Sequence, residues 1–157
     1  MADRNSRTRL AERLTSALAL RTAPIGIRFL GAGEESLAPA FAGPIAEPNR
    51  AGRTGAVPAG CVFWVKAQNR AFSTVAADHA NCSVGSYTHG FLTLAEAVKT
   101  DDVAAVLEAG WIDPAAVEAL PHVRKRPERI VYGPLATLPV DPDVVLLARA
   151  PACRRRR

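Results

Sequence analysis

Apolar residues recur along the chain with two different spacings, which predict helices and strands in loose alternation. Leu10, Leu14 and Leu18 recur every fourth residue, with charged residues mostly elsewhere, so we expect an amphipathic helix over residues 4–20. Residues 25–30 alternate apolar with small or polar side chains, which is typical of a half-buried strand. The chain therefore begins with a packing helix followed by a strand.

The stretch between residues 31 and 76 carries weaker signals. Residues 37–41 predict one short turn of helix, and residues 43–60, rich in Gly, Pro and Ala, predict a loop. A loop this long is usually functional or mobile, so either a lid over a pocket or a disordered stretch fits it. Residues 62–67 are apolar and suit a buried strand or a short helix equally, whereas residues 72–76 predict a strand.

Capping residues mark the helices of the second half. Residues 78–90 predict a turn, a short helix and a second turn. Thr93 followed by Glu96 fits a capping box, which places a helix start at Thr93. A further helix over residues 101–109 stops at Gly110, and Asp113 before Pro114 opens another that ends before Pro121.

Two further strands complete the expected fold. Residues 129–133 and 144–147 predict strands, and the second is a continuous apolar run that suits the centre of a sheet. The alternation predicts one α/β or α+β domain with a mixed sheet flanked by helices. We expect an N-terminal helix over residues 1–20, the α/β domain over 21–148 and a disordered basic tail over 149–157.

Composition and charge narrow the possible functions. Hydrophobic content of 48% and charged content of 22% are those of a globular protein. Four of the five net positive charges lie in the terminal arginine run 154–157, which leaves about +1 elsewhere, so we expect no nucleic-acid partner. No run of about 18 apolar residues and no signal-peptide core occurs, so we expect no membrane insertion and a cytoplasmic location with reduced thiols.

Residues 61–91 gather most of the groups that can bind or react. This segment holds two of the three cysteines and two of the three histidines. Cys61, Cys82, His79 and His89 are candidate ligands of a zinc ion or an iron–sulfur cluster, because thiolates and imidazoles are the donors that these cofactors use. No Cys-x-x-Cys pair occurs, so buried thiols that pack as small hydrophobes explain the same residues.

Two other functions are compatible with this segment. Cys82 at a helix start is a candidate nucleophile of a thiol enzyme, with His79 or His89 as its base. Ser83, Gly85 and Ser86 are small, so their backbone would let an anion or cofactor approach closely. A third possibility is a structural or interaction module with no site, which would use exposed apolar surface.

The order of these segments resembles a known family. Residues 23–30 (APIGIRFL) precede Cys61 and its apolar run, then come residues 74–91 with Cys82, and lastly residues 129–135 (RIVYGPL) and 142–147 (PDVVLL). Over residues 20–148 the chain resembles the domain of unknown function 169 family, an uncharacterised group of conserved prokaryotic proteins. The resemblance implies a cytoplasmic α/β protein in which Cys61 and Cys82 belong to the family pattern, and it implies no established reaction.

Members of that family generally continue well beyond the last of these strands. This chain instead runs from Ala148 through Cys153 into four arginines, so we expect a truncated or frame-shifted product. The function predicted is a cytoplasmic domain, built around Cys61 and Cys82, that binds a small molecule or a metal cofactor. Its oligomeric state, ligand and cofactor are not predicted.

Overall fold

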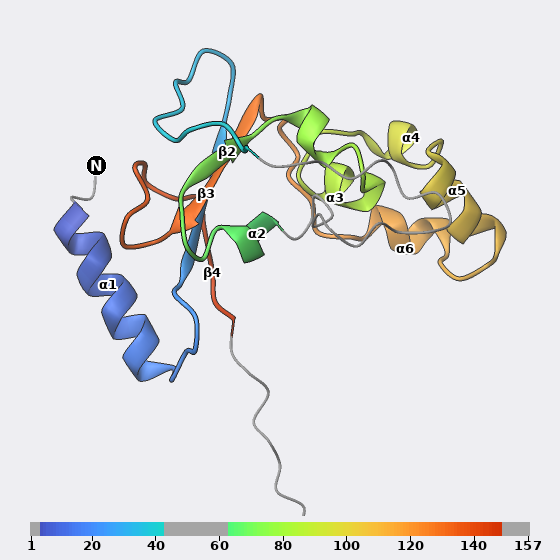
Figure 1. The fold of residues 1–157 in the computed structure, drawn as a ribbon. Coiled ribbons are helices and arrows are strands. Elements are labelled where there is room, and N and C mark those ends of the chain that lie inside the picture. Colours follow the sequence, from blue (N-terminus) through green and yellow to red (C-terminus); the bar gives the residue numbers. More distant parts are fainter. Residues whose placement is uncertain (1–3, 43–62, 149–157) are drawn as a thin grey trace, which may run out of the picture.

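The computed structural model describes residues 4–42 and 63–148, which form helices and one four-stranded sheet. The elements in chain order are α1 (Arg4–Ala17), β1 (Ile25–Leu30), α2 (Phe63–Lys66), β2 (Phe72–Thr74), the 3-10 helix η2 (Ala76–His79), α3 (Ser83–Thr88), α4 (Leu94–Ala97), α5 (Asp101–Glu108), α6 (Pro114–Glu118), β3 (Arg129–Pro134) and β4 (Val144–Leu146). Figure 1 shows α1 on one side of the sheet and α3 to α6 gathered on the other. The predicted single domain of mixed helices and strands is confirmed.

The sheet has the order β2-β3-β1-β4, and its three strand pairings are antiparallel. β1 pairs with β3 along its whole length, from Ile25 opposite Pro134 to Leu30 opposite Arg129. Within the described residues, parallel pairing is limited to an isolated bridge between Ala40 and Ser73. The central pair β1 and β3 therefore holds the sheet together.

Apolar side chains from the sheet and from α2 form the main core. Its buried members are Ile25, Phe63, Ala67, Phe72, Phe91, Ile130 and Tyr132. Burial of each large side chain of this kind contributes about 1.5–3 kcal/mol to folding. The rings of Phe41 and Phe63 meet edge to face with their centroids 4.9 Å apart, and the rings of Phe72 and Tyr132 stack with theirs 5.6 Å apart. The core thus lies where α2 packs on the sheet.

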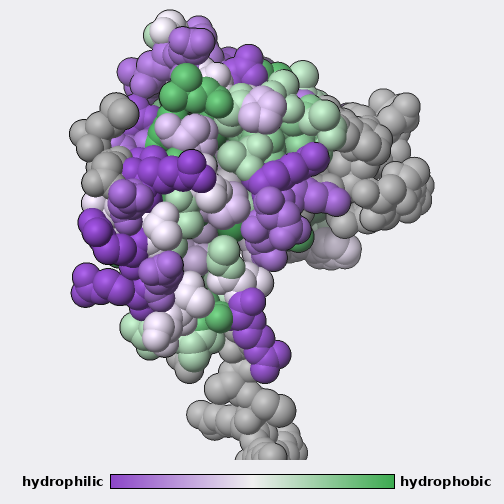
Figure 2. Space-filling model, turned by 60° about the vertical axis from the view of Figure 1, so that its left-hand side comes forward, coloured by the Kyte–Doolittle hydropathy of each residue, from purple (hydrophilic) through white to green (hydrophobic). Residues whose placement is uncertain are grey.

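Helix α1 is attached through a charged residue rather than through its leucines. Arg7 is 9% exposed and donates to Asp141 Oδ1 at 2.7 Å and to the Leu138 carbonyl at 3.0 Å. The predicted helix is confirmed, but Leu10 and Leu18 are 45% and 38% exposed. Figure 2 shows this side of the molecule turned forward, and hydrophilic side chains lie between the hydrophobic ones on that surface.

Two sequence predictions are wrong, one about a short helix and one about the place of a strand in the sheet. Residues 37–41 form no helix, because Phe41 donates its N–H to the Ser73 carbonyl and Ser73 donates to Pro39, which holds the chain along β2. The apolar run that begins at Val144 is an edge strand, not the sheet centre. Its side chains stay partly exposed, Val144 by 45% and Leu147 by 39%.

Several other predictions that rest on residues close together in the sequence are confirmed. Residues 63–66 of the ambiguous segment are helical, and Thr93 and Glu96 form the predicted capping box. Asp113 caps α6 by accepting from the Ala115 N–H at 2.7 Å. In the part of the chain that the structure describes, no helix is both long and apolar enough to cross a bilayer. The predicted loop 43–60, the tail 149–157 and Cys61 lie outside that part.

Candidate functional site

The segment from η2 to the end of α3 brings two histidines together. η2 ends at His79, and α3 ends with His89 as its C-terminal cap. Gly90 follows at a φ of 80°, a left-handed conformation that turns the chain back toward the core. The two imidazole centroids are 5.1 Å apart, so these two predicted site residues lie side by side.

His79 is completely buried, with 0% exposure. Its Nε2 lies 2.9 Å from Thr74 Oγ1, while its Nδ1 has no hydrogen-bond partner among the described residues. Because buried donors are rarely left without partners, the favoured tautomer donates Nε2–H to Thr74 and keeps a lone pair on Nδ1. Burial, and then the neighbouring His89, lowers the pKa of His79 to about 3, so the ring is neutral at pH 7.

His89 is oriented by the backbone of α3. Its Nδ1 lies 2.7 Å from the Gly85 carbonyl, and a carbonyl only accepts, so Nδ1 carries the proton. The lone pair of this ring is therefore on Nε2. Burial lowers the pKa of His89, while the bond to Gly85 acts in the opposite direction. Each of the two imidazoles thus has one nitrogen held by the protein and the other carrying a lone pair.

Aromatic side chains enclose the pair. The ring of Phe63 is 5.0 Å from His79 between centroids, and the ring of Phe91 is 4.8 Å from it. Tyr132 of β3 lies 6.3 Å from His89. These rings keep water away from the imidazoles, which is the physical cause of the lowered pKa values.

The contacts described for Cys82 support helix α3. Cys82 is the N-cap of that helix, is half-buried, and accepts the Gly85 N–H on its sulfur at 3.2 Å. Its amide donates to the His79 carbonyl at 3.1 Å. The sulfur therefore replaces the side-chain oxygen that most helix N-caps supply.

The residues predicted to receive an anion have partners within the protein. Asp102 of α5 accepts the Ser83 N–H at 3.2 Å. Burial raises the pKa of this carboxyl, but hydrogen bonds, first those from the Ser83 and Thr100 side chains and then that from the Ser83 N–H, lower the pKa overall. Ser86 donates its hydroxyl to the His79 carbonyl at 2.9 Å. The Gly85 amide bonds to Cys82. These groups fix the position of α3, and their use by a bound cofactor stays a prediction.

The predicted ligands are only partly brought together. Residues 4–42 and 63–148 contain no group of three His, Cys, Asp or Glu side chains close enough to hold a metal ion. His79 and His89 therefore form a pair, and Cys61 is not among the described residues. Thr74 and Asp102 were missed by sequence reasoning. Neither contact had a signal in the sequence, because each joins residues of different elements.

Most of the chain matches a protein-family model. A family model described as DUF169, an uncharacterised ArCR, matches residues 13–155, which include the histidine pair and all four strands. The resemblance predicted over residues 20–148 is confirmed. No curated protein and no solved structure matches the chain.

Proposed function

The chain belongs to the uncharacterised DUF169 family, and on that premise we propose that it binds a metal cofactor at the paired histidines His79 and His89. One observation carries the proposal. Two neutral imidazoles lie 5.1 Å apart, each held through one nitrogen by the protein and each with a lone pair on the other.

This arrangement suits metal ligation for two reasons. Metal-binding histidines usually donate their second ring N–H to an oxygen of the protein, as the tautomers here do toward Thr74 and Gly85. Ligands must also be free of the proton that a metal displaces, and the lowered pKa values of both rings remove that competition. A buried lone pair on His79 Nδ1 with no partner among the described residues gives the metal a vacant donor.

The remaining ligands would be thiolates or solvent. Cys61 stands two residues before Phe63, whose ring packs on His79. Imidazole and thiolate donors together favour zinc or iron over magnesium or calcium. When bound, such a metal supplies Lewis-acid or electron-transfer chemistry. We expect the protein to act in a reducing, cytoplasmic environment, in which Cys61 and Cys82 stay as thiols.

The test is metal analysis of protein purified without oxygen. We expect about one zinc or iron per chain in the wild type and loss of most of it in His79→Gln and His89→Gln. His122→Gln is the matched control, because His122 lies outside the pair and stacks on Tyr87. Cys61→Ser and Cys82→Ser then show which thiol contributes.

A metal-free wild type would contradict the proposal, and so would equal metal loss in all three histidine variants. Circular dichroism of each variant separates loss of a ligand from loss of the fold.

The second candidate is a thiol enzyme with Cys82 as nucleophile. Its support is the position of the half-buried sulfur at the start of α3. The neighbouring Ser83 amide, which an oxyanion would need, already donates to Asp102. Alkylation of Cys82 at pH 7 at the rate of an ordinary exposed thiol would argue against this function.

A further inference from the structure

A hollow beside the histidine pair lies between the end of β1 and the segment before β3. It has a volume of about 790 Å³, within the roughly 300–1,000 Å³ of small-molecule sites. Its lining residues are Gly31, Ala32, Glu34, Ala76, Phe91, Lys125, Arg126, Pro127 and Glu128. Phe91 also packs on His79, so one ring separates the hollow from the buried imidazole.

Lys125 and Arg126 act on carboxyls at longer range, Lys125 on Glu34 and Arg126 on Glu96, but neither cation forms an ion pair within the described part of the chain. Among the described residues, no carboxylate lies within 4.0 Å of the nitrogen atoms of Lys125 or Arg126. Arg126 also lines a second hollow of about 310 Å³, next to Tyr87 and His122. Lys125 Nζ lies near the end of β1: a Cβ built on Gly31, the residue after this strand, would be 3.8 Å from it.

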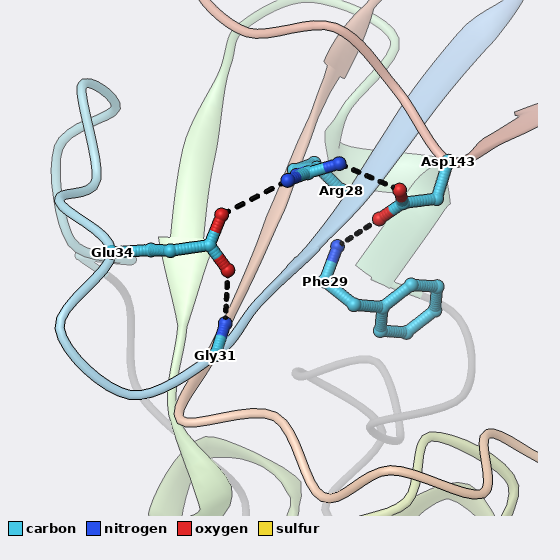
Figure 3. A network of polar contacts seen from close by, with 5 residues as sticks. All are labelled: Arg28, Phe29, Gly31, Glu34 and Asp143. Carbon is cyan, nitrogen blue, oxygen red and sulfur yellow. Dashed lines mark hydrogen bonds and ion pairs between the residues drawn. The ribbon is translucent and has the colours of Figure 1, made fainter.

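Glu34, a carboxylate of the lining, already accepts from other donors, although its partner Arg28 also donates to Asp143 at 2.7 Å. Glu34 Oε1 accepts from Arg28 at 2.9 Å, and Oε2 accepts the Gly31 N–H at 2.6 Å (Figure 3). These bonds, the Gly31 N–H first, lower the pKa of Glu34 and hold both oxygens. Glu128 carries the other negative charge of the lining and opposes an anion there.

The backbone that carries the two cations is fixed at both ends. Val123 donates its N–H to the Thr88 carbonyl at 3.0 Å, and Glu128 donates to the Leu30 carbonyl at 2.9 Å. Gly90 lies so close that an added Cβ would stand 2.7 Å from the Val123 carbonyl oxygen. Anchoring of this kind reduces the ordering that a ligand would have to impose.

From these observations we infer that the hollow binds a small organic anion, with its carboxylate or phosphate group on Lys125 and Arg126 and its apolar body against Ala32 and Ala76. The apolar part of the lining consists of Ala32, Ala76, Phe91 and Pro127, of which Ala32 and Ala76 are exposed. Arginine and lysine are the usual partners of both anionic groups. This site is distinct from the metal proposed at the histidines and does not depend on it.

The test uses three probes that share one ring: benzoate, phenyl phosphate and the neutral benzyl alcohol. Binding is followed by calorimetry and by protein NMR shifts at low salt, because ionic contacts weaken as salt rises. We expect one of the two anions, or both, to bind saturably and benzyl alcohol to bind at least tenfold more weakly. The stronger anion identifies the head group.

Variants locate the site. Lys125→Ala with Arg126→Ala should weaken anion binding at least tenfold, whereas Glu128→Gln should leave it equal or tighten it by removing a repelling charge. Arg13→Ala removes one positive charge from exposed α1 and should change binding less than twofold. Absence of saturable binding for both anions would overturn the inference, as would equal binding of benzyl alcohol or an unchanged affinity in the folded double variant.

Discussion

Substitution of Gly90 by alanine tests how closely the histidine segment packs on the chain before β3. Gly90 has a φ of 80°, and a Cβ there would lie 2.7 Å from the Val123 carbonyl oxygen and 3.3 Å from Pro127 Cδ. Real Cβ atoms essentially never approach another heavy atom to less than 3.0 Å. The obstacle is backbone, so a side-chain rotation cannot relieve it.

Gly110 and Gly33 provide matched controls. Their φ values are 69° and 77°, and an added Cβ at either position would meet nothing within 4 Å. Alanine at these positions costs about 1–2 kcal/mol for the left-handed backbone, partly offset by about 0.4–1 kcal/mol from a less flexible unfolded chain. We therefore expect a net loss of about 0–1.6 kcal/mol in each control.

Gly90→Ala has the same backbone cost and a steric cost in addition. Relief of the contact requires residues 123–127 to move, which endangers the Val123 to Thr88 hydrogen bond, worth about 0.5–1.5 kcal/mol, and the packing around it. We expect this variant to unfold with about 2 kcal/mol less free energy than Gly110→Ala, which corresponds to a melting temperature about 4–8 °C lower.

Urea unfolding followed by tryptophan fluorescence measures these differences. The three variants should keep the same slope against urea, because the surface exposed on unfolding is unchanged. Agreement of Gly90→Ala and Gly110→Ala within about 0.5 kcal/mol, the size of an ordinary surface effect, would refute the close approach inferred for Gly90.

Three further predictions concern charge and packing. His79 is neutral in the fold, with a pKa of about 3, so the free energy of unfolding should fall by up to about 1.4 kcal/mol for each unit by which the pH is lowered from 6.5 to 3. In urea titrations His79→Gln should flatten this pH dependence, and an unchanged dependence would contradict the prediction. Arg7→Ala should lower the free energy of unfolding by about 1–3 kcal/mol and speed proteolysis of α1, whereas the exposed Arg9→Ala should do neither. Gly133→Ala, whose Cβ would meet a backbone Cα at 2.9 Å, should lower the melting temperature more than Gly26→Ala, whose Cβ would meet a flexible leucine methyl at 2.7 Å; equal melting temperatures would contradict this.

Features of the fold that depend on neighbouring residues were predictable from the sequence. Thr93 and Asp113 cap helices through bonds to amides two or three residues later, so their roles are visible in the sequence itself. The strand at residues 25–30 was recognisable for the same reason, since alternation is a local pattern. Such features need no knowledge of distant partners.

Features that depend on distant partners were not predictable. The run from Val144 to Leu147 is apolar enough for a sheet centre, yet the strand order leaves it at the edge. Residues 37–41 lack helix because Ser73, more than 30 residues away, bonds to the Phe41 amide. Local propensity in both places gives way to tertiary pairing.

In the candidate site, too, only the features that depend on nearby residues were predictable. His79 and His89 lie in one segment, so their proximity could be anticipated from spacing. Their neutral state could not, because it depends on burial by rings from other elements, such as Phe63 of α2 and Tyr132 of β3. The engagement of the Ser83 amide by Asp102, 19 residues later, was likewise invisible in the sequence.

The position of β1 also bears on how the protein is made. Both of its neighbours come late, since Leu30 pairs with Arg129 and Ile27 with Val144, so about 100 residues must leave the ribosome after β1 before either edge is hydrogen-bonded. At about 5–20 residues per second, synthesis of that stretch takes about 5–20 s. During that time an apolar strand with two open edges is available to chaperones. A nascent chain halted before residue 129 would keep β1 in that state, and the sheet would assemble only when about the last fifth of the chain emerges.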